Sequence, residues 1–312
     1  MKPRVSVVMA NYNYGRYLAA SVESVLAQSM PDLELIVADD GSTDSSMQVL
    51  ERYAGDGRVR VVQLHHVGQS RAKNAAVDAA TGPLIAFIDA DDCWQPDKLA
   101  RQVEIFDANE NVGVVYTRRT LIDENGKPLD SPQPALHRGD VLEAIFRTNF
   151  VCFSSAVARR VVLDHVGGFD PALDLAVDYD LWLRIAPHYR FDYVDAPLVQ
   201  YRVGHGNLSR RAGERLRTVL MLMNRFLYER GGINRIGRET IRNSLADTYC
   251  SMGLALRPFT RLQSCAWFAH ALAQRPSSIT AWRGLAGACV PAAWRGKWEL
   301  AYRSPANDPR NV

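Results

Sequence analysis

Up to about Arg118, short apolar runs alternate with amphipathic stretches, and this alternation is the feature that most limits the folds open to the chain. Short apolar runs bounded by glycine, proline or acidic residues are typical of buried parallel strands. Strands that alternate with helices form a parallel sheet covered by helices on both faces. We predict such an α/β fold, with strands at Val5–Ala10, Leu33–Ala38, Val59–Leu64, Leu84–Ile88 and Val112–Tyr116, and helices at Arg16–Gln28, Asp44–Tyr53, Ser70–Ala80 and Asp97–Ala108.

The composition is that of an ordinary globular protein. With 312 residues, 47% of them hydrophobic, the chain is long enough to bury a large core and to carry an accessory region. A net charge of +3 does not indicate nucleic-acid binding. The five cysteines show no metal-binding spacing, which predicts reduced thiols in a cytoplasmic protein. We expect no signal peptide, and no stretch approaches the ~20 apolar residues that cross a bilayer.

Polar residues follow three of the predicted strands. In open α/β sheets, ligands bind in the crevice beyond the carboxyl ends of the strands. The residues at these ends are Asn11-Tyr12-Asn13, Asp39-Asp40-Gly41-Ser42 and Asp89-Ala90-Asp91-Asp92. We therefore expect the ligand site to be built from them.

The last of these groups sets three carboxylates in four positions, which allows two interpretations. Like charges this close stay ionised in a partly buried crevice only with a cation or strong hydrogen-bond donors beside them. Carboxylate oxygens suit Mg²⁺ or Mn²⁺, and magnesium sites commonly combine one or two carboxylates with substrate phosphates. The alternative is a solvated acidic turn before a helix that starts near Pro96 and Asp97. The cluster alone leaves the two interpretations even.

Three strand-end motifs, taken together, resemble the signature of glycosyltransferase family 2. They are Val5–Asn13, Ala38–Asp44 and Phe87–Pro96, and their order, spacing and residue types agree with that signature. The resemblance covers about residues 4 to 209. It implies the GT-A fold, which is Rossmann-like, with a mostly parallel sheet flanked by helices. It also implies transfer of a sugar from a nucleotide diphosphate donor with inversion at the anomeric carbon.

On the donor side, Ala10 and Tyr12 match the family's nucleotide contacts after the first strand, with Tyr12 placed near the base. Asp40 matches the aspartate that hydrogen-bonds the base, usually uracil or thymine. An ordinary turn and helix cap is the alternative for this motif. Arg71 matches a donor-contacting basic position, whereas Lys73 stands where arginine is more usual. The resemblance therefore implies a UDP- or dTDP-sugar donor.

The acidic cluster matches the family's DxD motif. Asp91 is the position best matched to direct coordination of a metal, and Asp89 and Ala90 belong to the same donor-binding motif. The implied cofactor is a divalent cation, Mn²⁺ or Mg²⁺, which bridges the donor phosphates and stabilises charge on the departing diphosphate. Asp92 either orients the acceptor or caps the following helix.

An inverting transferase also needs a base that takes the proton from the acceptor hydroxyl. The segment Gly167–Arg184 looks like the family's acceptor-side motif, often written Glu-Asp before a helix. Asp178 matches the catalytic base, while Val177 occupies the position of the glutamate and departs from the motif. A helix N-cap is the alternative role for Asp178, and one residue can fill both. Asp180 is expected to be solvated or paired with Arg184 one turn later.

We divide the chain where the resemblance ends. Residues 1–209 form the expected catalytic domain, with a nucleotide-sugar half at 1–118 and an acceptor half at 119–209. Its last loop, with Arg202 and His205, is expected to be a flap over the donor. Residues 210–312 form a helical region, with later helices at Arg238–Leu256, Arg261–Gln274 and Ser278–Cys289. This arginine- and tryptophan-containing region either packs on the catalytic domain or a partner protein, or rests on an anionic membrane.

The resemblance therefore implies an enzyme that moves a sugar from a UDP- or dTDP-sugar to a hydroxyl of a glycan or lipid-linked acceptor. Relatives of this kind commonly act in cell-envelope or exopolysaccharide synthesis. We expect a cytoplasmic protein, with attachment to the inner face of the plasma membrane as an alternative. The rival hypothesis is a nucleotide-sugar-binding scaffold without activity, because of Val177 and the helical tail. A sugar nucleotidyltransferase or a dehydrogenase is disfavoured, because no glycine-rich phosphate loop follows the first strand.

Overall fold

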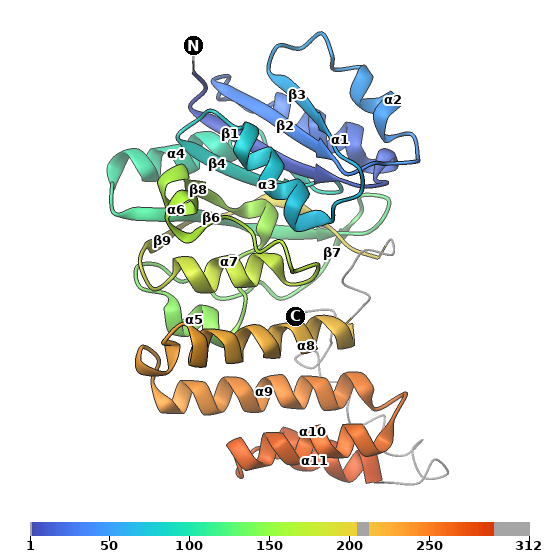
Figure 1. The fold of residues 1–312 in the computed structure, drawn as a ribbon, viewed down its shortest axis with the longest axis vertical. Coiled ribbons are helices and arrows are strands. Elements are labelled where there is room, and N and C mark those ends of the chain that lie inside the picture. Colours follow the sequence, from blue (N-terminus) through green and yellow to red (C-terminus); the bar gives the residue numbers. More distant parts are fainter. Residues whose placement is uncertain (1, 205–211, 290–312) are drawn as a thin grey trace. The chain divides into compact units, whose positions relative to one another are not determined.

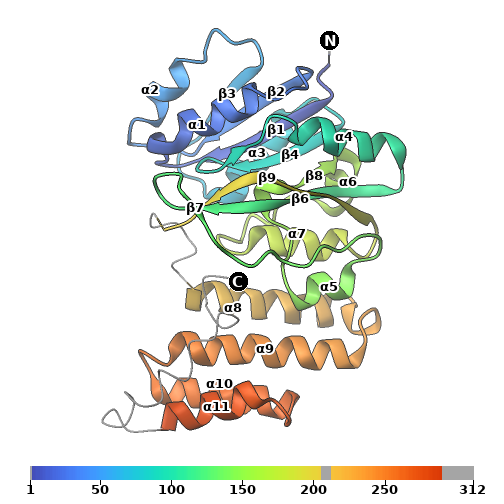
Figure 2. The same cartoon turned by 180° about the vertical axis from the view of Figure 1, so that it is seen from behind.

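The computed structural model describes residues 2–204 and 212–289, and the chain divides into two compact units. One unit contains Met1–Val141 and Phe150–His205, and the other contains Leu142–Asn149 and Gly206–Val312. Each unit has a hydrophobic core of its own. Figures 1 and 2 show their elements from opposite sides.

A mixed sheet of nine strands forms the centre of the first unit. Its order is β3-β2-β1-β4-β8-β6-β9-β5, and β7 pairs with the end of β6. The strands are β1 (Val5–Asn11), β2 (Leu33–Asp39), β3 (Val59–Gln63), β4 (Leu84–Asp89), β5 (Cys93–Trp94), β6 (Val112–Ile122), β7 (Pro128–Leu129), β8 (Val157–Arg159) and β9 (Arg190–Arg202).

Strands β1 to β4 run parallel, as the alternating pattern predicts. Strands β1, β2 and β4 are buried along almost their whole length, which explains why they read as continuous apolar runs. Strands β2 and β3 lie on one side of β1 and β4 lies on the other. The order of the strands therefore reverses between β1 and β4, and such a switch point is where α/β sheets bind ligands.

The other half of the sheet departs from the predicted parallel pattern. Strand β8 has three residues and pairs antiparallel with both β4 and β6. Strand β6 continues to Ile122 instead of ending at Tyr116, because its second half pairs with β9 and β7. Strands β8 and β9 lie far from β6 in the sequence, so local periodicity could not indicate these pairings.

Helices cover both faces of this sheet. Figure 2 shows one face with α1 (Gly15–Leu26), α2 (Ser46–Glu51) and α4 (Lys98–Ala108), and Figure 1 shows the other with α3 (Gln69–Ala79), α6 (Arg160–Val166) and α7 (Val177–Ile185). On the first face, Leu18 and Val25 of α1 belong to the main core. On the second, the ring of Phe87 in β4 lies 5.8 Å from that of Phe169 and 6.0 Å from that of Trp182 in α7, between ring centroids.

The second unit is helical. Its helices are α5 (Leu142–Arg147), α8 (Ala212–Asn224), α9 (Arg238–Leu256), α10 (Arg261–Gln274) and α11 (Ile279–Cys289), and a π-helical turn at Arg225–Glu229 follows α8. Helices α9 and α10 have the predicted bounds, and α11 begins one residue later than predicted. No helix in the described ranges has both the length and the apolar content needed to cross a bilayer.

Helix α5 groups with this second unit, although its sequence position lies inside the predicted acceptor half. The Glu143 carboxylate accepts hydrogen bonds from the Gly237 N–H at 2.9 Å and from the Thr240 hydroxyl at 2.7 Å, at the start of α9. This contact attaches α5 to the C-terminal helices. The boundaries at residues 118 and 209 stay predictions.

Candidate active site

The parallel strands bring the three predicted strand-end motifs to one edge of the sheet. In the strand register, Ala10 of β1 lies opposite Asp89 of β4, and Asn11 lies opposite Asp39 of β2. The loops that carry Tyr12, Asp40 and the acidic cluster therefore leave the sheet side by side. This edge is the candidate active site.

Asp39 organises the loop after β2. Its carboxylate accepts hydrogen bonds from the Asn11 side-chain amide at 2.6 Å, from the Ser42 N–H at 3.0 Å and from the Ser42 hydroxyl at 2.7 Å. The side chain is buried, with 2% of the residue exposed. These bonds tie the ends of β1 and β2 together and give Asp39 a structural role.

Asp40 holds the loop between β3 and α3. One carboxylate oxygen accepts the Val67 N–H at 2.6 Å and the other accepts the Gly68 N–H at 2.9 Å. Each carboxylate oxygen has a second lone pair, so these bonds leave acceptor capacity on both atoms. Tyr12 is 41% exposed, and its ring lies 4.3 Å from that of His66, between centroids. Asp40 and Tyr12, the residues predicted to contact the base, thus both lie against the loop between β3 and α3.

In the acidic loop, Asp89 and Asp92 have different surroundings. The Lys73 ammonium donates to the Asp89 carboxylate at 3.0 Å, and also lies 3.6 Å from the centre of the Phe153 ring. Asp92 is fully buried and accepts hydrogen bonds from the Ser154 hydroxyl at 2.5 Å and from the Arg202 N–H at 2.9 Å. Burial, with the charges of Asp91 and Asp89 added, raises the pKa of the Asp92 carboxyl well above its usual range.

Of the two alternatives for Asp92, the structure supports neither. Helix α4 begins at Lys98 and its N-cap residue is Asp97, so Asp92 is not the cap. Its side chain has no exposed surface with which to meet an acceptor. Asp92 instead connects the acidic loop to Ser154 and to strand β9.

Arg202 is the last residue of β9 and is buried, with 7% of the residue exposed. Its guanidinium donates to the Asp91 main-chain oxygen at 2.9 Å and to the Asp123 main-chain oxygen at 3.1 Å. These bonds fix the path of the acidic loop. The predicted flap role of Arg202 stays a prediction, and His205 lies outside the described residues.

The acidic loop fits a divalent cation that receives part of its ligands from the substrate. The described residues contain no group of three or more His, Cys, Asp or Glu side chains arranged around one point. Asp89 and Asp91 supply hard carboxylate oxygens, and Mg²⁺ usually combines one or two such groups with phosphates and water. Negative charge at this loop also acts on Tyr14: burial first, and then Asp91 and Asp89, raise the pKa of its hydroxyl.

Arg71 and Lys73 come from the same turn of α3 and differ in exposure. Lys73 is buried, with 5% of the residue exposed, and pairs with Asp89. Arg71 is exposed, and its guanidinium donates to the Val67 main-chain oxygen at 3.3 Å. Arg71 is therefore available to a ligand at the surface, whereas Lys73 acts on the acidic loop itself.

Asp178 lies in the first turn of α7 and is partly exposed. The N-cap residue of this helix is Ala176, with a left-handed φ of 54°, so Asp178 is not the cap. Val177, at the position of the family's glutamate, is buried with 5% of the residue exposed. Asp180 is buried as well and pairs with the Arg184 guanidinium at 2.8 Å, which selects pairing over solvation.

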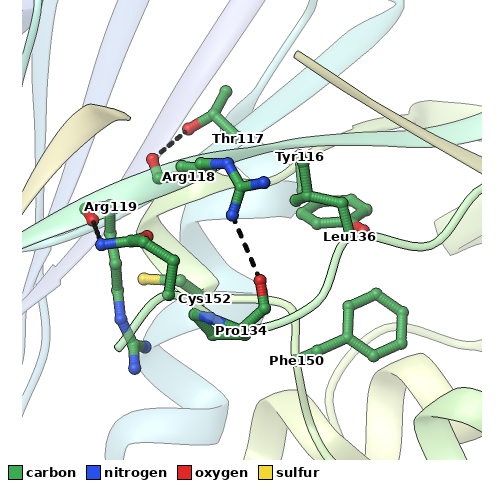
Figure 3. A pocket seen from close by; sticks show the side chains of 9 residues that line it. Tyr116, Thr117, Arg118, Arg119, Pro134, Leu136, Phe150 and Cys152 are labelled. Atoms are coloured by element: carbon green, nitrogen blue, oxygen red, sulfur yellow. Dashed lines mark hydrogen bonds between the residues drawn. The ribbon is translucent and has the colours of Figure 1, made fainter. Parts of the chain in front are cut away.

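A small pocket beside β6 was not indicated by any sequence motif (Figure 3). Its walls come from β6, from the loop before α5 and from the segment after it, and the lining residues are Tyr116, Thr117, Arg118, Arg119, Gln133, Pro134, Leu136, Phe150 and Cys152. Several polar groups in the wall are already paired: Gln133 donates to the Arg119 main-chain oxygen at 2.8 Å and Arg118 donates to that of Pro134 at 3.2 Å. Burial raises the pKa of the Cys152 thiol to about 12, so this cysteine stays a thiol.

Comparisons of the sequence with known proteins point to glycosyltransferases. Residues 6–167 match the sequence model of a family described as Glycosyl transferase family 2. The chain is 42% identical over 177 residues to the uncharacterized glycosyltransferase alr2836 of Nostoc sp., with 54% of each protein covered. It is 40% identical over 215 residues to the putative teichuronic acid biosynthesis glycosyltransferase TuaG of Bacillus subtilis, with 67% of this chain and 82% of TuaG covered. The match thus spans about half the length of the Nostoc protein.

Solved structures resemble the chain over most of its length. The mannosyltransferase PcManGT from Pyrobaculum calidifontis, in complex with GDP-Man and Mn²⁺, has a TM-score of 0.64 at 22% identity, covering 98% of this chain and 83% of that one. S. aureus TarS 1-349 in complex with UDP-GlcNAc has a TM-score of 0.60 at 17% identity, covering 97% and 93%. At these identities the likeness shows the fold, a GT-A-like α/β architecture with C-terminal helices.

Proposed function

The chain belongs to glycosyl transferase family 2, and from that premise we propose that it moves a sugar, with inversion, from a UDP- or dTDP-sugar to a hydroxyl of a glycan or lipid-linked acceptor. One observation carries the proposal. The parallel strands β1, β2 and β4 end side by side, so Tyr12, Asp40 and the acidic loop share one edge of the sheet. A nucleotide sugar needs a surface for its base and positive charge beside its diphosphate, and we propose that this edge supplies the first and holds a cation for the second.

On the donor side, Ala10, Tyr12 and Asp40 would contact the nucleotide, and Arg71 would contact its phosphates. Asp89 and Asp91 would hold the divalent cation, with Ala90 between them close to the donor. A bound Mn²⁺ or Mg²⁺ would act as a Lewis acid that stabilises charge on the departing diphosphate. The Mn²⁺ and GDP-Man of PcManGT and the UDP-GlcNAc of TarS support this assignment by analogy of fold.

On the acceptor side, Asp178 would take the proton from the attacking hydroxyl. The residue is partly exposed, as a base that meets a substrate must be. Proton removal makes the acceptor oxygen a better nucleophile, and attack opposite the diphosphate inverts the anomeric carbon. The buried Val177 beside it cannot hydrogen-bond an acceptor, so other residues would position the sugar.

The biological setting is proposed from the relatives. TuaG is described as a teichuronic acid biosynthesis glycosyltransferase, and a putative glycosyltransferase EpsH of the same organism is also similar to this chain. We therefore propose that the activity serves cell-envelope or exopolysaccharide synthesis, in a cytoplasmic protein, with attachment to the inner face of the plasma membrane as the alternative. The contact of the C-terminal helices with the catalytic domain, a partner protein or a membrane stays a prediction.

The rival function is a scaffold that binds nucleotide sugars without turning them over, and the buried Val177 is the observation in its favour. Donor hydrolysis separates the two functions. We expect slow release of UDP or dTDP from some member of a nucleotide-sugar panel in the presence of Mn²⁺. Binding of a nucleotide sugar without any release or transfer would instead support the scaffold.

A further inference from the structure

Asn74 of α3 pairs with the backbone of Phe169, far away in the sequence. The Phe169 N–H donates to the Asn74 Oδ1 at 2.8 Å, and the Asn74 Nδ2 donates to the Phe169 carbonyl oxygen at 2.8 Å. A primary amide has a donor and an acceptor side by side, so it can satisfy both polar groups of one residue. This pair fixes the position and the orientation of the chain at Phe169.

Two further side chains of α3 hold the residues that follow. The Ser70 hydroxyl donates to the Leu173 carbonyl oxygen at 2.5 Å, and the Gln69 side-chain amide donates to the Asp174 carbonyl oxygen. All of these contacts are made to the backbone of residues 169–174. Helix α3 therefore sets the path of this segment whatever side chains the segment carries.

Gly168, the residue just before this segment, is packed closely against Asn74. Gly168 has a left-handed φ of 63°, and a Cβ atom added there would lie 2.8 Å from the Asn74 Oδ1. That separation is too short for a real side chain. Glycine at this position is what allows the chain to approach the amide.

The held segment leads directly into the turn that carries Asp178. Ala176 adopts a left-handed φ of 54°, which a residue with a side chain keeps only where its surroundings impose it. The first hydrogen bond of α7 then forms from the Asp180 N–H to the Ala176 carbonyl oxygen at 3.2 Å. The path of residues 169–174 along α3 therefore determines where the turn before Asp178 begins, and Arg184 of α7 fixes the helix to the Val166 and Gly168 carbonyl oxygens at 2.7 and 2.6 Å.

The same helix acts on the donor side. Lys73, next to Asn74, donates to the Asp89 carboxylate, and the loop that precedes α3 is held by Asp40 through the Val67 and Gly68 N–H groups. We propose that Asn74 is a positioning residue: it sets the acceptor base Asp178 against the donor carboxylates through one rigid helix. The inference rests on the proposed function, since the role of Asp178 as a base is part of that proposal.

Hydrogen–deuterium exchange of the full chain tests the proposal, with Asn74→Ala as the variant. We expect amides from Phe169 to Asp180 to exchange at least tenfold faster, while β1 and β4 keep wild-type rates. The matched control is Asp78→Asn, an exposed residue of the same helix, which should leave all rates unchanged. Unchanged exchange at 169–180, or equal acceleration in β1 and β4, would overturn the positioning role.

A functional readout separates positioning from general destabilisation. With UDP and Mn²⁺ as probes, Asn74→Ala should keep its dissociation constant within twofold of wild type, because it does not touch the donor edge. Release of UDP from UDP-GlcNAc, with water in the place of the acceptor, should fall at least tenfold. Equal losses of UDP binding and UDP release would contradict the inference. If the wild-type chain binds neither UDP nor dTDP in the presence of Mn²⁺, the donor assignment fails, while the exchange pattern still decides the role of Asn74.

A double-mutant cycle tests the close approach itself. Gly168→Ala should speed exchange at 169–180 in the wild-type background, because the new methyl group meets the Asn74 amide. In the Asn74→Ala background the same change should add less, because that amide is gone; residues in contact are expected to be non-additive. Additive effects of the two changes would show that Gly168 and Asn74 act independently.

Discussion

Asp178 is the side chain on which the proposed chemistry depends most directly. Asparagine has nearly the same shape but cannot take a proton, so Asp178→Asn should lower the rate of transfer by about 10²–10⁴-fold, the usual contribution of a general base. Donor affinity should be unchanged, because the proposed donor contacts lie on other elements. Steady-state kinetics together with calorimetric titration of the donor would measure the two quantities.

The matched control for this change is Asp164→Asn, which alters an exposed carboxylate of α6 and should leave kinetics unchanged. Wild-type transfer by Asp178→Asn would remove Asp178 from the mechanism. A parallel loss of donor affinity would point instead to a disturbed donor site.

Lys98 gives a prediction for the pH dependence of stability. The residue is fully buried in α4, its Nζ donates to the Gln102 side-chain oxygen at 2.8 Å, and burial lowers its pKa well below the usual range. Between that lowered pKa and the unfolded value of about 10.4, the unfolded chain binds more protons, so the free energy of unfolding should rise with pH. Lys98→Met should remove this contribution to the slope.

Urea unfolding at several pH values between neutral and 10 would measure that slope for both proteins. Lys98→Met should also lose about 1–3 kcal/mol of stability, because the buried Gln102 oxygen loses its donor. Lys127→Met, at an exposed position, serves as the control and should keep the wild-type slope. Identical slopes for Lys98→Met and wild type would refute the assignment.

At the scale of elements, the packing of α9, α10 and α11 depends on small residues around Phe268. This ring is fully buried and would contact a Cβ atom added at Gly253 or at Gly284. Gly284→Ala should therefore destabilise the second unit by about 1–3 kcal/mol, the usual cost of overpacking a core. Thermal unfolding followed by circular dichroism would detect the lower transition temperature.

Gly287→Ala is the internal comparison, because it lies in the same helix. A Cβ atom there would meet the Arg257 guanidinium at 3.2 Å, the end of a flexible side chain. Alanine is favoured over glycine inside a helix by about 1 kcal/mol, so this variant should be neutral or more stable. If both variants lowered stability equally, contact with Phe268 would not be the cause.

The elements that were predicted correctly are those whose signal is local. Strands β1, β2 and β4 are continuous apolar runs, and α9 and α10 carry clear boundaries, so their positions follow from the sequence. Strand β8 could not be predicted, because three residues carry no periodicity and its partners in β4 and β6 are distant. Residues 142–147, which form α5, lie inside the predicted acceptor half, because their contact with the start of α9 is visible only in space.

In the candidate site, too, residues marked by a local motif were predicted, and residues defined by distant contacts were not. Motif order marked Asp40, Asp89, Asp91 and Asp178, and the fold brings the first three to one edge of the sheet. The surroundings of Asp92 were not predictable, because they depend on Ser154 and the end of β9. The contacts of Asn74 were missed for the same reason.

At the scale of the whole molecule, the central claim is that a nucleotide sugar binds at the acidic loop together with a divalent cation. A ligand that binds the folded state alone raises the melting temperature by mass action. Binding of a nucleotide sugar at Asp91 should therefore raise the stability of the unit that contains this residue. Metal dependence of that shift separates the proposed site from nonspecific nucleotide binding.

The most direct test is a thermal-shift screen of UDP- and dTDP-sugars with and without Mn²⁺, run on the wild type and on Asp91→Asn. We expect at least one donor to raise the melting temperature of the wild type only when Mn²⁺ is present, and we expect Asp91→Asn to lose that shift. A donor-induced shift that is the same without Mn²⁺, or the same in Asp91→Asn, would contradict the account.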